Sequence, residues 1–291
     1  MAKIKSIKNI NNNNCIETGK RVIPNVYNIE VKDNHNYFVN GLLVANCGAK
    51  TFTDLLPEFQ HVYYKFGFSG TFLRGDSKTM DMHGFLSEII YNYPAKKATE
   101  EGYLTPTCYK IHTILGKGSR NYHKEYTDNY CGKKFFSDIV DIVLDIPKDE
   151  QILILTDRKE KSGEALFKMI SGFRKECVYV SGDENKEQIQ QHIEDFNDKK
   201  VKIMIGTTVI GEGIDVHSTQ HLILANGGKS VIKIVQAIGR CVRKHEGKEK
   251  SYIYDFNFAG TTYLEGHLSQ RLKIYKDNFD GEIRFQKTRR T

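Results

Sequence analysis

Apolar, β-branched runs alternate with helical patterns throughout residues 147–256, and this alternation limits the possible folds more than any other feature of the chain. Five runs are expected to be strands: Gln151–Leu155, Cys177–Val180, Val201–Ile205, His221–Leu224 and Ser251–Asp255. Strands that alternate with helices join through right-handed crossovers into a parallel sheet with helices on both faces. The sequence therefore predicts an α/β domain built on a parallel sheet.

Two helices of this region have start signals. Asn185 and Gln188 have the spacing of a capping box, and Ser230 can cap a second helix that runs to about Arg243. In the first helix, the apolar residues expected on one face are Ile189, Ile193 and Phe196.

Two segments of this region suggest phosphate chemistry. Gly206–Asp215 follows an expected strand, where its glycines let the backbone approach a ligand and Thr207 offers a hydroxyl and an amide to a phosphate. Gln236, Arg240 and Arg243 stand at i, i+4 and i+7, which predicts one helical face with an amide and two guanidinium groups. Two arginines on one face can neutralise the charge of a transferring γ-phosphate.

The order of these segments resembles the superfamily 2 helicases of the DEAD/DEAH group. Four segments carry the resemblance: Phe66–Thr71 is similar to motif III, Leu153–Arg158 to motif IV, Thr207–Asp215 to motif V and Gln236–Arg243 to motif VI. His267–Tyr275 resembles the helical tail of phage and bacterial repair members. The resemblance covers roughly residues 47–280 and implies a RecA-like C-terminal helicase domain, preceded by part of another RecA-like domain.

The resemblance also implies roles for individual residues. Arg240 and Arg243 would contact ATP phosphates and serve hydrolysis. The residues expected to bind ATP or to couple its cleft to nucleic acid are Gly213, Asp215, Gln236, Gly239, Arg240 and Arg243. Those expected to contact nucleic acid or to link hydrolysis to domain movement are Ser69, Gly70, Thr71, Thr156, Arg158, Thr207 and Thr208.

The sequence contains no G-x-x-x-x-G-K-[ST] phosphate loop and no Asp-Glu pair ahead of motif III. Hydrolysis of ATP needs a lysine that binds the phosphates and carboxylates that hold Mg²⁺. We therefore expect the metal ligands on a missing N-terminal part and none in this chain, which alone should not hydrolyse ATP. No C-x-x-C pair occurs among the six cysteines, so no zinc site is indicated.

The segment Val26–Cys47 resembles the C-terminal end of an intein, a short all-β fragment of the Hint type. Asn40-Gly41 predicts a hairpin turn between two strands. Asn46 can cyclise onto its own carbonyl, Cys47 can accept an acyl group as a thioester, and His35 can act as acid or base. These three residues are the predicted catalytic residues of protein splicing at the Asn46-Cys47 bond.

The resemblances together divide the chain into five parts. They are an intein fragment (1–46), the end of RecA-like domain 1 (47–105), a helical connection (106–146), RecA-like domain 2 (147–257) and a helical basic tail (258–291). The expected partners are an N-terminal intein–helicase half, which splicing would join to this chain, and nucleic acid, with DNA favoured. A truncated gene from a contiguous intein is the alternative to a naturally split one.

Composition bears on the partners and the location of the chain. A net charge of +7 suits a polyanionic partner, and no apolar run is long enough to cross a bilayer, so a cytoplasmic location in a bacterium or phage-infected cell is expected.

Three interpretations of the whole chain remain open. The chain could be a helicase part completed by splicing, or a passive nucleic-acid-binding module with a non-functional intein remnant. It could also be an inactive fragment, in keeping with Asn28 and Gly48 at positions where the families usually have Asp and His.

Overall fold

The structure is a computed structural model in which the chain forms two units, residues 1–90 and 91–291. It describes the backbone of residues 4–10, 26–31, 36–39 and 42–45, and residues 89–158, 162–207, 216, 218–279 and 281–287. In the first unit, β1 (Ile4–Ile10) pairs antiparallel with β2 (Val26–Val31), and β3 (Asn36–Val39) pairs antiparallel with β4 (Leu42–Ala45).

The β3–β4 pair agrees with the expected hairpin. Val39 is opposite Leu42 and Asn36 is opposite Ala45, so the Asn40-Gly41 dipeptide separates the two strands in the sequence. Two-residue connections of this composition suit the right-handed twist of a hairpin. The pairing of β3 with β4 is therefore the one expected for two strands on either side of this dipeptide.

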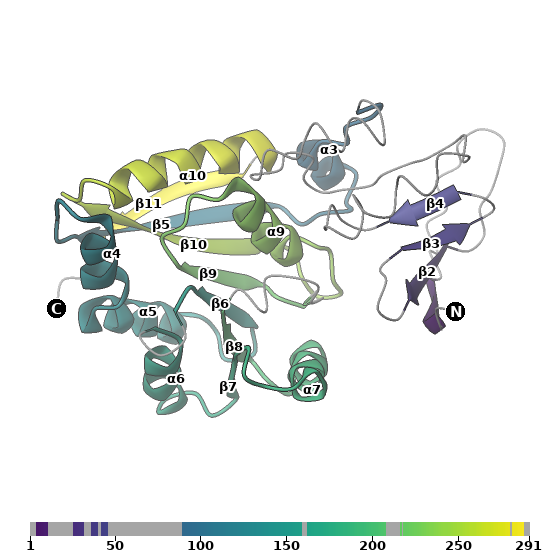
Figure 1. The fold of residues 1–291 in the computed structure, drawn as a ribbon, viewed down its shortest axis with the longest axis horizontal. Coiled ribbons are helices and arrows are strands. Elements are labelled where there is room, and N and C mark those ends of the chain that lie inside the picture. The colour runs from purple at the N-terminus through teal and green to yellow at the C-terminus, as the bar shows by residue number, and fades with distance from the viewer. Residues whose placement is uncertain are drawn as a thin grey trace. The chain divides into compact units, whose positions relative to one another are not determined.

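The second unit is built on a parallel sheet of seven strands in the order β11-β5-β10-β9-β6-β8-β7 (Figure 1). Its strands are β5 (Thr107–Leu115), β6 (Ile152–Thr156), β7 (Cys177–Val180), β8 (Ile203–Gly206), β9 (His221–Ala225), β10 (Ser251–Ala259) and β11 (Glu282–Lys287). Five of these were predicted, and their parallel arrangement is confirmed.

Helices cover both faces of this sheet. They are α3 (Ala95–Glu100), α4 (Tyr122–Tyr130), α5 (Lys133–Asp145), α6 (Glu164–Ser171), α7 (Lys186–Asn197), α9 (Val231–Cys241) and α10 (Leu264–Asn278). Side chains of α4, α5 and α6 form one core with the sheet, and those of α7, α9 and most of α10 form the other. Alternate residues of β6 divide between the two cores: Leu153 and Leu155 belong to one, and Ile152 and Ile154 to the other.

The capping box at the start of α7 is confirmed. The Asn185 side chain accepts from the Gln188 backbone N–H at 2.8 Å, and the Asn185 N–H donates to the Gln188 side chain at 3.2 Å. Ile193 and Phe196 are buried, and Ile189 packs against the same core. The apolar spacing therefore identified the buried face of this helix correctly.

The range 106–146, expected as a helical connection, contributes a strand as well as α4 and α5. Strand β5 pairs with β10 over nine residues, from Ser251 opposite Thr107 to Ala259 opposite Leu115. Its pattern is not simply apolar because Lys110 and His112 point at the aromatic rings of β10. The expected helical tail likewise contains α10 and then β11, a short and mostly exposed edge strand in which only Ile283 packs against the core.

Candidate functional site

Thr156 and Thr207, both predicted to contact nucleic acid or to couple it to ATP hydrolysis, lie at one edge of the sheet. All seven strands are parallel, so the loops that follow them share the edge at their carboxyl ends. Thr156 ends β6 and is buried, and its hydroxyl donates to the Gly206 carbonyl at 3.4 Å, directly before Thr207. The structure therefore brings Thr156 and Thr207 together on neighbouring strands.

The loop after β6 is held by a tyrosine of α4. The Tyr126 hydroxyl donates to the Asp157 carboxylate at 2.8 Å, and the Arg158 guanidinium carbon lies 5.2 Å from the centre of the Tyr126 ring. Burial raises the pKa of Tyr126 strongly, and the charge of Asp157 adds to this, so the hydroxyl remains a donor. Arg158 is thereby kept at the carboxyl edge, near Thr156.

The loop that leads from β9 into α9 is fastened by α4 and α10. The Gly227 N–H donates to the Tyr126 hydroxyl at 3.5 Å, and His267 Nδ1 lies 3.0 Å from the Gly227 carbonyl oxygen. Arg271 also donates to the Gly228 carbonyl at 3.4 Å. One tyrosine therefore links the loops after β6 and β9, a role for Tyr126 that the sequence did not indicate because no motif spans the two loops.

Helix α9 carries most of the predicted ATP-binding residues. Its apolar side is buried against the sheet, whereas Gln236, Gly239 and Arg240 are half-buried. A Cβ atom at Gly239 would meet no atom of the described residues within 4 Å. Gln236, Gly239 and Arg240 therefore share a side of the helix with open space beside the glycine. Ser230 is the N-cap residue, but its side chain makes no capping hydrogen bond.

Arg243 does not share that helical face, so this prediction was wrong. The helix ends at Cys241, and Arg243 is exposed in an antiparallel bridge with Leu104. The reason lies in the carbonyl groups at the helix end. Thr105 N–H donates to the Val242 carbonyl at 2.9 Å, and Lys248 Nζ donates to the carbonyls of Cys241 and Arg243. These partners turn the chain into an extended path after Val242.

The remaining predicted site residues lie outside the described residues. They are His35, Asn46, Cys47, Ser69, Gly70, Thr71, Thr208, Gly213 and Asp215.

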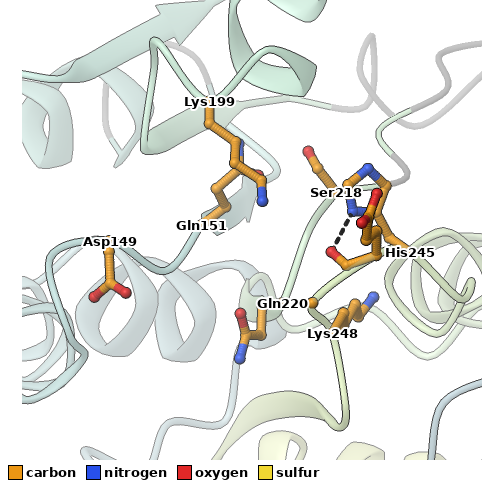
Figure 2. Close-up of a pocket in the computed structure, with 9 residues that line it drawn as sticks. Asp149, Gln151, Lys199, Ser218, Gln220, His245 and Lys248 are labelled. Atoms are coloured by element: carbon orange, nitrogen blue, oxygen red, sulfur yellow. Dashed lines mark hydrogen bonds between the residues drawn. The ribbon is translucent and has the colours of Figure 1, made fainter.

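A small cavity of about 40 Å³ lies at the opposite edge of the sheet (Figure 2). Gln151, directly before β6, and Gln220, directly before β9, line this cavity. Lys199, Ser218 and Lys248 also line it. None of the predicted site residues lines it. The cavity is therefore separate from the loops at the carboxyl edge.

Within the ranges that the structure describes, no group of three His, Cys, Asp or Glu side chains could hold a metal ion. Among the helices of those same ranges, none combines the length and apolar character that a membrane crossing requires.

Comparison with known proteins identifies the sheet domain. Residues 134–245, which run from α5 to just beyond α9, match the helicase conserved C-terminal domain. The ATP-dependent DNA helicase UvsW of Enterobacteria phage T4 is 26% identical over 258 residues, which cover 78% of this chain and 50% of UvsW. The chain spans about half the length of the curated relatives it matches.

Solved structures show the same fold. The T4 UvsW crystal structure matches with a TM-score of 0.51 at 19% identity, over 86% of this chain and 54% of that one. S. cerevisiae Dbp5 bound to RNA and ADP BeF3 has a TM-score of 0.58 at 13% identity, over 85% of this chain and 59% of that one. The Type ISP restriction-modification enzyme LlaBIII bound to DNA has a TM-score of 0.58 at 13% identity, over 86% of this chain and 22% of that one.

The sequence match and the parallel sheet agree: residues 134–245 match the helicase conserved C-terminal domain, and the chain is similar to phage UvsW in sequence and in fold.

Proposed function

We propose that this chain is the C-terminal part of an ATP-dependent helicase or translocase that acts on nucleic acid, with DNA favoured. The observation that carries the proposal is the match of residues 134–245 to the helicase C-terminal domain, because this range contains the segments similar to motifs IV, V and VI. DNA is favoured because the relative UvsW is an ATP-dependent DNA helicase.

The open side of α9 would face ATP. Gln236 and Arg240 project from this side, and Gly239 leaves room for a phosphate or for a neighbouring backbone to approach. Arg243 would contribute its guanidinium from the chain that follows the helix, where it is exposed. Guanidinium groups suit phosphate oxygens because their N–H groups can donate in pairs.

The carboxyl edge of the sheet would contact nucleic acid. Thr156, Arg158 and Thr207 stand there, and Arg158 is held beside Tyr126. By the family resemblance, the residues expected to extend this contact or couple it to ATP are Ser69, Gly70, Thr71, Thr208, Gly213 and Asp215. Phosphate contacts of this kind position a helicase on its strand without reading sequence.

ATP hydrolysis would also need groups from an N-terminal half. The phosphate-binding lysine and the carboxylates that hold Mg²⁺ would lie on that half, and Arg240 and Arg243 would act across the cleft between the two RecA-like domains. The side chains of α9 fit this division of groups between the two halves, because they offer cationic and amide groups to phosphate oxygens.

The test is hydrolysis by the protein purified from its source through a tag placed after Thr291. We expect ATP hydrolysis that nucleic acid stimulates, and a loss of at least tenfold in kcat in the Arg240→Ala or Arg243→Ala variant, since an arginine finger contributes about 10³ or more. The chain expressed alone should hydrolyse no ATP.

Lys233→Ala is the matched control, because Lys233 is an exposed cation on the same helix, and it should leave hydrolysis unchanged. Hydrolysis that survives both arginine substitutions would refute the assigned roles. Binding of nucleic acid without any hydrolysis in the tagged protein would favour a passive binding module.

We further propose that residues 1–46 act as an intein fragment and join residues 47–291 to the N-terminal half. The antiparallel β3–β4 pair ends one residue before Asn46, which supports a hairpin that presents the Asn46-Cys47 bond. The Cys47 thiolate would attack the carbonyl group through which the N-terminal flank is joined to the partner's intein fragment, and the flank would pass to Cys47 as a thioester while that fragment leaves. The Asn46 side-chain nitrogen would then attack its own carbonyl and break the bond to Cys47, with His35 moving the proton. An S-to-N acyl shift would leave a peptide bond.

Tryptic mass spectrometry of the source cells or virions distinguishes the spliced from the unspliced chain. Unspliced chain contains the peptide from Asp33 to Lys50, because trypsin cuts after Lys32 and Lys50. Spliced product instead contains a peptide that ends Cys47-Gly48-Ala49-Lys50 and begins with residues foreign to this chain. Detection of the unspliced peptide alone would refute splicing and indicate a non-functional intein remnant.

A further inference from the structure

The segment from Gly116 to Lys124 comprises the connection between β5 and α4 and the first three residues of α4, at the carboxyl edge of the sheet. It carries the exposed side chains Lys117, Arg120, His123 and Lys124. We propose that this segment, here called the basic loop, is a further binding site for the phosphate backbone of single-stranded nucleic acid. It lies outside the segments that resemble helicase motifs, and the inference rests on the proposed nucleic-acid function.

The backbone of the basic loop is held by two buried side chains. Asn129 accepts from the Lys117 N–H at 2.8 Å and donates to the Lys117 carbonyl at 2.9 Å. Glu125 accepts from the Ser119 N–H at 3.0 Å. Gly116 N–H also donates to the Ala259 carbonyl at 2.9 Å. A loop fixed in this way loses little conformational entropy when it binds a ligand.

The charged ends of the loop side chains have no protein partner in the described part of the chain. No hydrogen bond or ion pair joins the charged groups of Lys117, Arg120 and Lys124 to a described residue. The carboxylate that directly follows the loop, Glu125 of α4, is buried and accepts from the backbone N–H groups of Ser119, Thr262, Tyr263 and Leu264. The exposed acids on α4 and on the helices α5 and α10 are Asp128, Asp141, Asp145, Glu265 and Asp277. A rigid loop with three cations and an internally bound carboxylate suits a polyanion.

The basic loop and the predicted nucleic-acid residues belong to the same edge. Tyr122, at the start of α4, contacts the Tyr126 ring, and the two ring centroids are 6.0 Å apart. The Arg158 guanidinium lies over the same Tyr126 ring. Tyr122 also contacts the rings of Tyr263 and His267 of the α10 region. Figure 1 shows α4 beside the end of the sheet where β5 terminates. The loop therefore extends the phosphate-binding edge around Thr156, Arg158 and Thr207 by a further cationic segment.

The test is binding of labelled single-stranded DNA and RNA by the full chain, measured by fluorescence anisotropy over a range of salt concentrations. The variant combines Lys117→Ala, Arg120→Ala and Lys124→Ala. We expect its Kd to rise by at least tenfold at low salt. The slope of log K against log salt should fall by about 2 for three lost contacts on a single strand. All three side chains are exposed, so its thermal melting should match that of the unchanged chain.

A matched variant removes three exposed cations from the opposite edge: Lys148→Ala, Lys175→Ala and Lys276→Ala. It should bind nearly as tightly as the unchanged chain, and an equal loss in both triple variants would overturn the inference. An equal loss on DNA and RNA supports a contact to phosphates that both polymers share. A loss on one polymer only would also support the site and would identify that polymer as its ligand.

Arg158→Ala separates this inference from the proposed function. If this variant binds weakly while the basic-loop variant binds normally, the inference is wrong and the proposed function stands. If the unchanged chain binds neither polymer, both the inference and the nucleic-acid contact proposed for this edge are wrong.

Discussion

The guanidinium of Arg271 and the carboxylate of Asp255 form a fully buried, two-point ion pair between α10 and the centre of β10. Arg271 Nε lies 2.8 Å from Asp255 Oδ2, and Nη2 lies 2.9 Å from Oδ1. The Tyr275 hydroxyl also donates to Oδ2 at 2.6 Å. Because Arg271 donates to the Gly228 carbonyl as well, the pair connects α10 both to the sheet and to the loop that precedes α9.

Removal of the Arg271 guanidinium should destabilise this domain strongly. Arg271→Ala leaves the Asp255 charge buried without its partner, which costs about 3–5 kcal/mol. Urea unfolding followed by circular dichroism measures the loss in the free energy of unfolding. Lys273→Ala, an exposed residue on the same helix, should change it by no more than about 0.5 kcal/mol. Equal stability of the two variants would contradict a structural role for the pair.

Glu125 should make the stability of the domain depend on acid pH. Burial raises the pKa of Glu125, but the backbone N–H groups of Ser119, Leu264, Tyr263 and Thr262 together lower it below its ordinary value of 4.5. Its contribution is therefore present above pH 4.5 and is lost as the pH falls through the lower pKa of the folded state.

Glu125→Gln tests this pH dependence, because the amide cannot ionise and accepts these bonds more weakly. The variant should be less stable than the unchanged chain at neutral pH, and the gap in free energy of unfolding should narrow as the pH falls below 4.5. A gap that stays constant with pH would show that the carboxylate charge is not what matters.

His112 should lower stability in mild acid. Burial, followed by the charge of Lys110, lowers the pKa of His112 from 6.5 to about 4. The unfolded chain therefore binds a proton that the folded chain does not between these values, so stability falls as the pH drops from 6.5 towards 4.

Replacement by Phe should remove this part of the pH dependence. The His112 ring already contacts Tyr254 and Phe256, and its buried Nε2 has no partner among the described residues. His112→Phe should therefore lose less free energy of unfolding than the unchanged chain between pH 6.5 and 4. His123→Phe, at an exposed position, should retain the original dependence. The same slope in the His112 variant would refute the assignment.

Gly227 should not tolerate even a methyl group. A Cβ atom there would lie 2.5 Å from the Tyr130 ring and 2.9 Å from the Tyr126 ring. Gly227→Ala should therefore cost about 1–3 kcal/mol, and it should disturb the link between Tyr126 and the loop before α9. Gly266→Ala is the control, since its Cβ would meet no described atom within 4 Å and alanine favours a helix by about 1 kcal/mol. Thermal melting of the two variants should shift in opposite directions.

Local patterns in the sequence determined much of the architecture. The β-branched runs located β6, β7, β8, β9 and β10, and the Asn185–Gln188 spacing located the start of α7, because these signals act between near neighbours in the chain. The spacing after Gln236 did not predict where α9 ends, since the carbonyl groups there are bound by Thr105, from a distant part of the chain, and by Lys248, from the segment that follows the helix. Strand β5 was missed because its Lys110 and His112 interrupt the apolar pattern, and the rings of β10 that these side chains contact come from a distant part of the chain.

The sequence by itself therefore determined the class of domain and the identity of the candidate phosphate-binding residues. Only the tertiary structure decided how those residues are held: Arg158 by Tyr126, the loop before α9 by His267 and the basic loop by Asn129. The physical reason is the range of the interactions. Helix and strand signals depend on residues a few positions apart, whereas hydrogen bonds and ring contacts join residues that only folding brings together.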